Sequence, residues 1–295
     1  MASENGKPTD TNVQAVRRHY AELFAAASAS PDPRLTEIVA SIPRENFVGP
    51  GPWTIVINGR RVVTPSADPA YLYSNNLVAL DDERNNGEPF LHAAWIGKIE
   101  PKPGEIVTHI GAGTGYYTAI LSGLVEPRGE VFAFEIDAGL AARAVANLKP
   151  YMNVTTGHAD AVTAELPPSD IIYVNAGVVA PPLGWLKILK QGGRLIFPWR
   201  PIDRVGVAAV VTRHAGGFAF DPFMSSWFIP CVGASIASAG SKLPTPNSAR
   251  RTRSLWLTED RKPDDTATAI FGDIWFSSDA IAPDDSSFRR RQRGL

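Results

Sequence analysis

The sequence predicts an α/β protein with a Rossmann-like doubly wound sheet, mostly parallel with antiparallel edge strands, plus N-terminal helices and a C-terminal extension. Between residues 105 and 200, short apolar runs alternate with helical segments, which is typical of parallel strands covered by helices on both faces. A glycine-rich turn at residues 111–115 joins the first of these strands to the first helix. Ligands of such sheets bind beyond the carboxyl ends of the strands, so this turn also marks a candidate site.

The first hundred residues predict helices and one hairpin ahead of the sheet. A helix starting at Asp10 or Thr11 carries its apolar residues on one face and ends at Ser30–Pro33. Asn58-Gly59 is a strong hairpin signal between two short apolar runs. Residues 1–10 predict a disordered tail. The other elements predicted here are a helix over residues 35–42, strands Thr54–Ile57 and Arg61–Thr64, and a helix over Phe90–Ile99.

The central part of the chain predicts the sheet itself. Its predicted strands are Ile106–Ile110, Val131–Ile136, Val154–Thr156, Ile171–Val174 and Arg194–Phe197. Its predicted helices are Tyr116–Leu124, Ala138–Leu148 and a segment near Leu183–Leu189. Lys190–Gly193 predicts a turn, and the β-rich runs Val205–Arg213 and Phe218–Val232 predict antiparallel strands that close the sheet edge.

The same pattern predicts how the chain is divided. Residues 11–100 form an N-terminal cap of helices and loops, and residues 101–235 form the cofactor-binding core. Residues 236–295 form a C-terminal extension of unknown role, which begins with a small, polar, proline-containing linker at 236–250. Within it, Ser254–Leu257 and Thr268–Trp275 predict a β-hairpin.

Composition excludes several classes of function. The chain has 29 basic and 30 acidic residues, so its overall charge indicates neither nucleic acid nor membrane as a partner. Cys231 is the single cysteine and the five histidines are scattered, so we expect neither a disulfide framework nor a metal site. No signal sequence and no apolar run of about 18 residues is seen, and we expect a cytoplasmic protein. The oligomeric state stays open.

The glycine turn predicts a nucleoside-containing ligand. Glycines at 111, 113 and 115 leave the backbone bare, and the helix that follows directs free N–H groups at a ligand. Glu135 ends the next strand, where a carboxylate can accept hydrogen bonds from both hydroxyls of a ribose. Asp160 and Asn175 follow two further strands of the predicted sheet.

The glycine spacing narrows the choice of ligand. A dinucleotide-binding G-x-G-x-x-G motif would have its third glycine at position 116, which is Tyr116. The observed G-x-G-x-G spacing favours a single nucleoside with a short charged tail. A nicotinamide-dependent dehydrogenase and a tight turn without a ligand are the alternatives.

Several segments together resemble a known family. Ile110–Tyr116 resembles the first motif of class I S-adenosylmethionine-dependent methyltransferases, and a tyrosine after the last glycine is typical of the protein-L-isoaspartate O-methyltransferase branch. Six further segments resemble other motifs of that family, and they occur in the same order over about residues 10–235. They are Pro43–Val48, Pro89–Ala93, Asn153-Val154 with Asp160, Asp170–Ala176, Leu189–Pro198 and Phe228–Gly233.

The resemblance implies S-adenosylmethionine as cofactor and a carboxylate of a protein, peptide or small molecule as methyl acceptor, with no nucleic acid. It implies that the glycine motif binds the methionine part and the ribose, that Glu135 binds the ribose hydroxyls, and that Asp160 binds the adenine amino group. Asn175 would lie near the sulfonium. The full implied set is His109, Gly111, Ala112, Gly113, Thr114, Gly115, Tyr116, Glu135, Ile136, His158, Ala159, Asp160 and Asn175.

Two departures from the family pattern affect the acceptor side. His109 stands where the family usually has glutamate, and Gly87 stands where it has a serine beside the substrate carboxylate. The acidic run at 81–83 and Glu88 would repel a carboxylate acceptor unless these side chains face solvent or pair with Arg84. The acceptor-side candidates are Gly87, Glu88 and His92.

These departures leave alternatives open. An amine or hydroxyl acceptor would need a general base, for which His92 is a candidate, although a histidine on a helix face often only packs. A protein that binds the cofactor without turnover is a further alternative. The basic run Arg289–Arg293 is a weak indication of nucleic-acid binding.

Overall fold

The computed structural model describes residues 10–235 and 242–281, and the chain forms two compact units. Unit 1 consists of Met1–Glu105 and Ala112–His158, and unit 2 of Ile106–Gly111 and Ala159–Leu295. The predicted tail up to residue 9 and the basic run at 289–293 lie outside the described residues. Asp10 is already the first residue of a helix.

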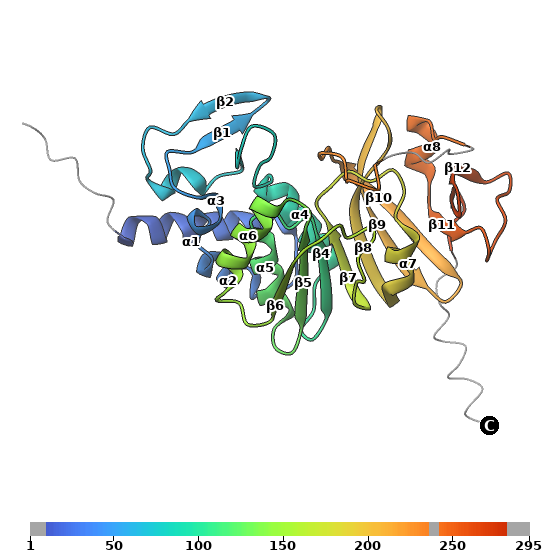
Figure 1. Cartoon of the computed structure of the whole chain (residues 1–295), viewed down its shortest axis with the longest axis horizontal. Helices are drawn as coiled ribbons and strands as arrows, with labels where there is room; N and C mark the ends of the chain where they lie inside the picture. The colour runs from blue at the N-terminus through green and yellow to red at the C-terminus, as the bar shows by residue number, and fades with distance from the viewer. Residues whose placement is uncertain (1–9, 236–241, 282–295) are drawn as a thin grey trace, which may run out of the picture. The chain divides into compact units, whose positions relative to one another are not determined.

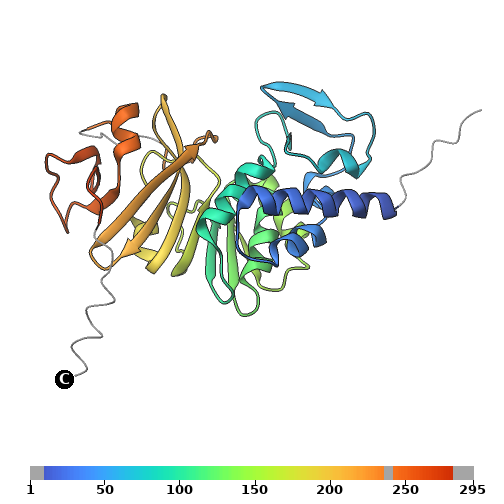
Figure 2. The same ribbon diagram turned by 180° about the vertical axis from the view of Figure 1, so that it is seen from behind.

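Three helices of unit 1 pack together. Helix α1 (Asp10–Ser28) contacts α2 (Leu35–Ser41) and α4 (Pro89–Ile99), as Figure 2 shows. Tyr20 and Phe24, one turn apart on α1, are fully buried. The apolar stripe of α1 is therefore used for packing inside the unit.

The predicted hairpin forms and gains a third strand. Strands β1 (Thr54–Ile57) and β2 (Arg60–Val63) pair through a turn in which Asn58 and Gly59 have φ values of 49° and 74°. Strand β3 (Leu77–Val78) pairs with the other side of β1, giving the order β2-β1-β3 (Figure 1). A core under this small sheet is formed by Val48 of α3 (Glu45–Val48), Trp53, Ile55, Leu72 of the 3₁₀ helix η1 (Pro69–Leu72), and Val78.

The rest of unit 1 is a βα segment of the doubly wound type. Helix α5 (Tyr116–Val125) precedes β5 (Glu130–Glu135), and α6 (Ala138–Leu148) precedes β6 (Val154–His158). Strands β5 and β6 are parallel. The Asp137 side chain accepts from the Leu140 N–H at 2.8 Å and so caps α6, which explains why this helix begins where the sequence predicted.

Unit 2 holds the other parallel strands. Strand β7 (Ser169–Val174) lies between β4 (Ile106–Ile110) and β8 (Leu189–Ile202), and both pairings are parallel. Helix α7 (Leu183–Ile188) runs directly into β8. The predicted turn at 190–193 is a bulge within β8, because Ser169 pairs with Leu189 and Ile171 pairs with Arg194. Lys190 and Asp170 form an ion pair at 2.8 Å across this bulge.

The antiparallel part of unit 2 is longer than expected. Strand β8 continues into β9 (Val205–His214) and β10 (Gly217–Ser225), and β11 (Ser254–Leu257) pairs with β10. The predicted strand at 218–232 therefore ends at Ser225, and Pro230 instead forms an isolated parallel bridge with Gly177. The predicted linker contains a short helix, α8 (Pro246–Arg251).

The prediction that Ser254–Leu257 forms a hairpin with Thr268–Trp275 is wrong. Strand β13 (Ile274–Ser277) pairs with both β11 and β12 (Ala267–Phe271), and the hairpin joins β12 to β13. Gly272 allows this turn because it adopts a φ of 56°. The sheet order in unit 2 is therefore β12-β13-β11-β10-β9-β8-β7-β4 (Figure 1).

Buried aromatic rings connect the C-terminal strands to the core of unit 2. Trp199 of β8 stacks on Phe276 of β13 with ring centroids 4.8 Å apart, and Phe220 of β10 meets both rings edge-on. All three side chains are buried. The C-terminal strands thus share one core with β8 and β10.

Candidate functional site

The glycine turn between β4 and α5 has the predicted backbone. Gly111, Gly113 and Gly115 have φ values of 71°, 57° and 97°, a region that glycine adopts without strain. A Cβ atom on Gly113 would have no neighbour within 4 Å, whereas one on Gly115 would lie 2.7 Å from Leu148 of α6. Gly113 therefore keeps open space over the turn, and Gly115 leaves room for the Leu148 side chain of α6.

The Glu135 carboxylate holds the glycine turn in place through hydrogen bonds to the backbone. Its Oε2 accepts the Gly113 N–H at 2.8 Å, and its Oε1 accepts the Asp137 N–H at 3.0 Å. The residue is only 8% exposed, so these two bonds hold the carboxylate in one orientation. Each oxygen retains capacity to accept another hydrogen bond, which a ribose hydroxyl can supply.

Thr114 presents an unpaired polar atom within the turn. Its side chain is buried, and its Oγ1 has no hydrogen-bond partner among the residues that the structure describes. Asn147 of α6 donates to the Thr114 carbonyl at 3.0 Å and holds the backbone here. Buried hydroxyls are normally hydrogen-bonded, so an unpaired one at this turn fits a ligand group.

His109 and Asn175 form a pair at the ends of neighbouring strands in unit 2. The Asn175 Nδ2 donates to the His109 Nε2 at 2.9 Å, and burial lowers the pKa of His109 to about 3. The imidazole is therefore neutral and accepts this bond. The Asn175 Oδ1 is buried without a partner in the described part of the chain. His109 thus orients Asn175, which the family resemblance predicts to lie near the sulfonium.

The candidates for the adenine lie on separate elements. In unit 2, the Asp160 Oδ1 accepts the Val162 N–H at 2.9 Å and caps the turn that follows. In unit 1, His158 is exposed at the end of β6, with its Nε2 3.1 Å from the Ile136 carbonyl oxygen. Ile136 is 42% exposed, so its side chain is available to contact a ligand.

The acceptor-side candidates Gly87 and His92 pack tightly together in unit 1. Gly87 has a φ of 72°, and a Cβ there would lie 2.5 Å from the His92 Nε2. His92 is buried and stacks on Tyr117 with ring centroids 3.7 Å apart. The stack leaves no room for the family's serine at position 87, which gives the departure in sequence a structural reason.

The acidic residues near Gly87 are paired or solvated. Arg84 forms ion pairs with Asp81 at 2.7 Å and with Asp137 at 2.5 Å. Asp82 is fully exposed, and the Glu88 carboxylate accepts a hydrogen bond from Asn75 at 2.7 Å. The expected repulsion of a carboxylate acceptor is thereby reduced, because most of these charges are neutralised or face water.

Arg44 is the functional candidate that sequence reasoning did not single out. Its guanidinium is completely buried and donates to the Leu72 carbonyl at 2.7 Å and the Gly87 carbonyl at 3.3 Å. It further donates to the carbonyls of Ser74 and Asn76 and to the Asn86 Oδ1. Arg44 therefore ties down the loop that ends at Gly87. The family-like segment Pro43–Val48 contained this signal, but not its role.

The turn fits a nucleoside-containing cofactor. Unit 1 offers the Glu135 carboxylate, the open face at Gly113 and the Thr114 hydroxyl, which has no hydrogen-bond partner in the described part of the chain. Over the described ranges, there is no group of three or more His, Cys, Asp or Glu residues that could hold a metal ion. The helices described are each too short or too polar to cross a membrane.

Comparison with known proteins decides the family. The sequence model of the protein-L-isoaspartate(D-aspartate) O-methyltransferase family matches residues 57–236. The chain belongs to this family. The protein-L-isoaspartate O-methyltransferase of Protochlamydia amoebophila is 30% identical over 217 residues, which are 72% of this chain and 94% of the relative. That of Pelotomaculum thermopropionicum is 29% identical over 237 residues, 77% of this chain and 93% of the relative.

Solved structures show the same fold. A protein-L-isoaspartate O-methyltransferase structure superposes with a TM-score of 0.64 at 20% identity, covering 90% of this chain and 88% of the other. A Plasmodium falciparum structure described as a β-aspartate methyltransferase in complex with S-adenosyl-L-homocysteine has a TM-score of 0.58 at 18% identity, covering 73% and 97%. The Rossmann-like fold predicted for this methyltransferase is confirmed.

Family membership also settles the class of enzyme. The predicted S-adenosylmethionine-dependent O-methyltransferase, with S-adenosylmethionine as cofactor, is confirmed at the level of the family. The dehydrogenase alternative is thereby excluded. The individual cofactor and acceptor residues stay predictions.

Proposed function

We propose that this methyltransferase esterifies the free carboxylate of an L-isoaspartyl or D-aspartyl residue in proteins and peptides. The observation that carries the proposal is the carboxylate of Glu135 fixed beneath the open face of Gly113, in a chain that belongs to the family. The neutralised acidic run near Gly87 supports a carboxylate acceptor.

In this proposal the cofactor contacts come from the predicted residues. Glu135 accepts hydrogen bonds from the ribose hydroxyls, and the Thr114 hydroxyl and the Asn175 carbonyl oxygen acquire the partners that they lack. Asp160 receives the adenine amino group, and Ile136 packs against the adenine ring. His109 acts through Asn175 rather than on the ligand, because its Nε2 is already bonded there.

The chemistry needs little from acid or base groups. When bound, S-adenosylmethionine would supply a methyl group on a sulfonium, from which a neutral thioether is a good leaving group. An acceptor carboxylate is ionised at pH 7 and attacks the methyl carbon directly. Methyl transfer to that carboxylate would give a methyl ester and release the neutral thioether S-adenosylhomocysteine. The protein contributes alignment and exclusion of water.

The acceptor side is bordered by three packed residues that do not act as an acid–base pair. They are Gly87, Glu88 and His92. His92 is buried in a stack, which favours packing over proton transfer. Arg44 holds the backbone at these residues through the Gly87 carbonyl. Small-molecule carboxylates, and amine or hydroxyl acceptors, are the alternatives, and the cytoplasmic location and the region boundaries stay predictions.

The test compares two peptides that differ in one linkage. Transfer of labelled methyl groups is measured on a peptide with an L-isoaspartyl residue and on the same peptide with a normal aspartyl residue. We expect base-labile methyl ester on the isoaspartyl peptide alone. Absence of ester while S-adenosylhomocysteine binds in calorimetry would refute the acceptor, and absence of that binding would refute the cofactor site.

A further inference from the structure

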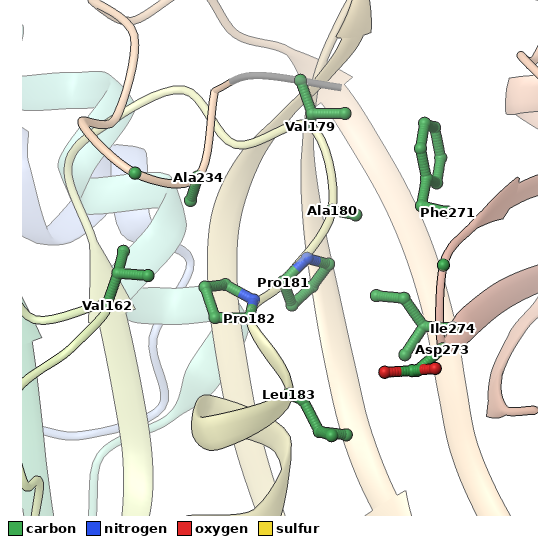
Figure 3. A pocket seen from close by; sticks show the side chains of 12 residues that line it. Val162, Val179, Ala180, Pro181, Pro182, Leu183, Ala234, Phe271, Asp273 and Ile274 are labelled. Atoms are coloured by element: carbon green, nitrogen blue, oxygen red, sulfur yellow. The ribbon is translucent and has the colours of Figure 1, made fainter. Parts of the chain in front are cut away.

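A cavity of about 250 Å³ lies in unit 2, between the loop at residues 179–183 and the β12–β13 turn at residues 271–274 (Figure 3). We call it the Asp273 cavity. Its walls are formed by Val162, Val179, Ala180, Pro181, Pro182, Leu183, Gly233, Ala234, Phe271, Gly272, Asp273 and Ile274.

Apart from Asp273, the side chains that line the cavity are apolar. Asp273 is the single charged residue among those that line the cavity. Figure 3 shows Asp273 at the β12–β13 turn, across the cavity from Pro181 and Leu183. Asp273 is exposed, and its carboxylate forms no ion pair within the described ranges. A cavity that combines apolar side chains with one carboxylate free of ion pairs is complementary to a group with an apolar stem and a cationic end.

The size of the cavity limits its occupant. Sites for small molecules usually have volumes of about 300–1,000 Å³, so this cavity is too small for a nucleoside cofactor and suits one or two side chains. Lysine and arginine have the required apolar stem and terminal cation.

One wall of the cavity is close in sequence to a predicted site residue. The loop at 179–183 continues the segment that leaves β7 at Asn175, whose side-chain Oδ1 has no hydrogen-bond partner among the described residues. The opposite wall belongs to the C-terminal extension, beyond residue 236 where the family match ends. The extension thus adds a wall to the segment that follows a predicted site residue.

We propose that the Asp273 cavity binds a lysine or arginine side chain of the acceptor protein, close in sequence to the residue that is methylated. Its stem packs against Pro181 and Ile274, and its cation pairs with Asp273. This inference rests on the proposed function and makes the C-terminal extension a determinant of acceptor specificity.

The test is a set of isoaspartyl peptides in which lysine, leucine or glutamate is placed in turn at each flanking position. At one position we expect lysine to lower KM about two- to five-fold relative to glutamate at unchanged kcat, the range of an exposed ion pair. Asp273→Asn should abolish this preference and Asp273→Lys should reverse it. Ala180→Trp, which fills the cavity, should raise KM for the lysine peptide.

Asp265→Asn is the matched control, because Asp265 is also an exposed aspartate of the extension but does not line the cavity. Equal KM values for all peptides, or the same change in Asp265→Asn as in Asp273→Asn, would overturn the inference. The same peptides are titrated by calorimetry with S-adenosylhomocysteine present. If no peptide is methylated but Asp273→Asn still weakens binding of the lysine peptide, the proposed function fails and the cavity assignment holds.

Discussion

Replacing Glu135 by glutamine tests the link between the glycine turn and the cofactor. The carboxylate accepts two backbone N–H groups, from Gly113 at 2.8 Å and from Asp137 at 3.0 Å, at a position that is 8% exposed. A glutamine side chain has nearly the same shape, but only one of its two terminal atoms is an acceptor. One of the two N–H groups must therefore face an amide NH₂ group.

The expected loss follows from these two bonds. A buried N–H left without an acceptor costs about 1–3 kcal/mol, and the bond that remains loses the advantage of a charged acceptor, about 1 kcal/mol. We expect Glu135→Gln to lower the free energy of unfolding by about 2–4 kcal/mol. The Kd for S-adenosylhomocysteine should rise at least about ten-fold, because the ribose hydroxyls lose the same carboxylate.

Urea denaturation measures the first quantity and calorimetric titration of S-adenosylhomocysteine measures the second. Glu130→Gln is the matched control, since Glu130 lies at the other, exposed end of the same strand. Native-like stability and native-like affinity in Glu135→Gln would refute the reasoning, as would an equal loss of affinity in Glu130→Gln.

Three further substitutions test other parts of the site. Arg44→Lys offers three donors to five buried or part-buried acceptors, so urea denaturation should show a loss of at least about 2 kcal/mol that the exposed Arg60→Lys does not share. Gly115→Ala should cost about 1–3 kcal/mol for a φ of 97° alone, and calorimetry should show weaker binding of S-adenosylhomocysteine. The pKa of His109 is about 3 in the folded state against 6.5 unfolded, so the unfolded state binds more protons between these values and stability falls as pH is lowered from 6.5. The slope from this group is at most about 1.4 kcal/mol per pH unit; His109→Gln should flatten it and the exposed His158→Gln should not.

The sequence was most informative where structure is local. Helix α6 begins at its predicted residue because Asp137 caps it, and the β1–β2 turn forms because Asn58 and Gly59 accept positive φ values. The C-terminal strands show the limit of such reasoning. Strand β13 pairs with β11 as well as with β12. Its Phe276 stacks on Trp199 of β8, and this stabilising contact joins residues far apart in the chain.

In the candidate site too, features set by local sequence could be predicted and features set by tertiary contacts could not. The glycine turn, Glu135 and the family resemblance could be predicted, because spacing and residue type encode them. The reason for Gly87 could not, since it depends on the stack of His92 on Tyr117. The motif Pro43–Val48 includes Arg44 but does not indicate its role. That role depends on the five acceptors that the folded loop places around the guanidinium.

The sequence by itself thus determined the fold class, the cofactor and the family of this methyltransferase, since these depend on local backbone geometry and on motifs in order. Tertiary structure alone decided that His109 is a neutral partner of Asn175, that position 87 must be glycine, and that Asp273 lines a cavity whose other side chains are apolar. Each of these facts depends on burial and contact between side chains that are distant in sequence, and no local pattern records such contacts.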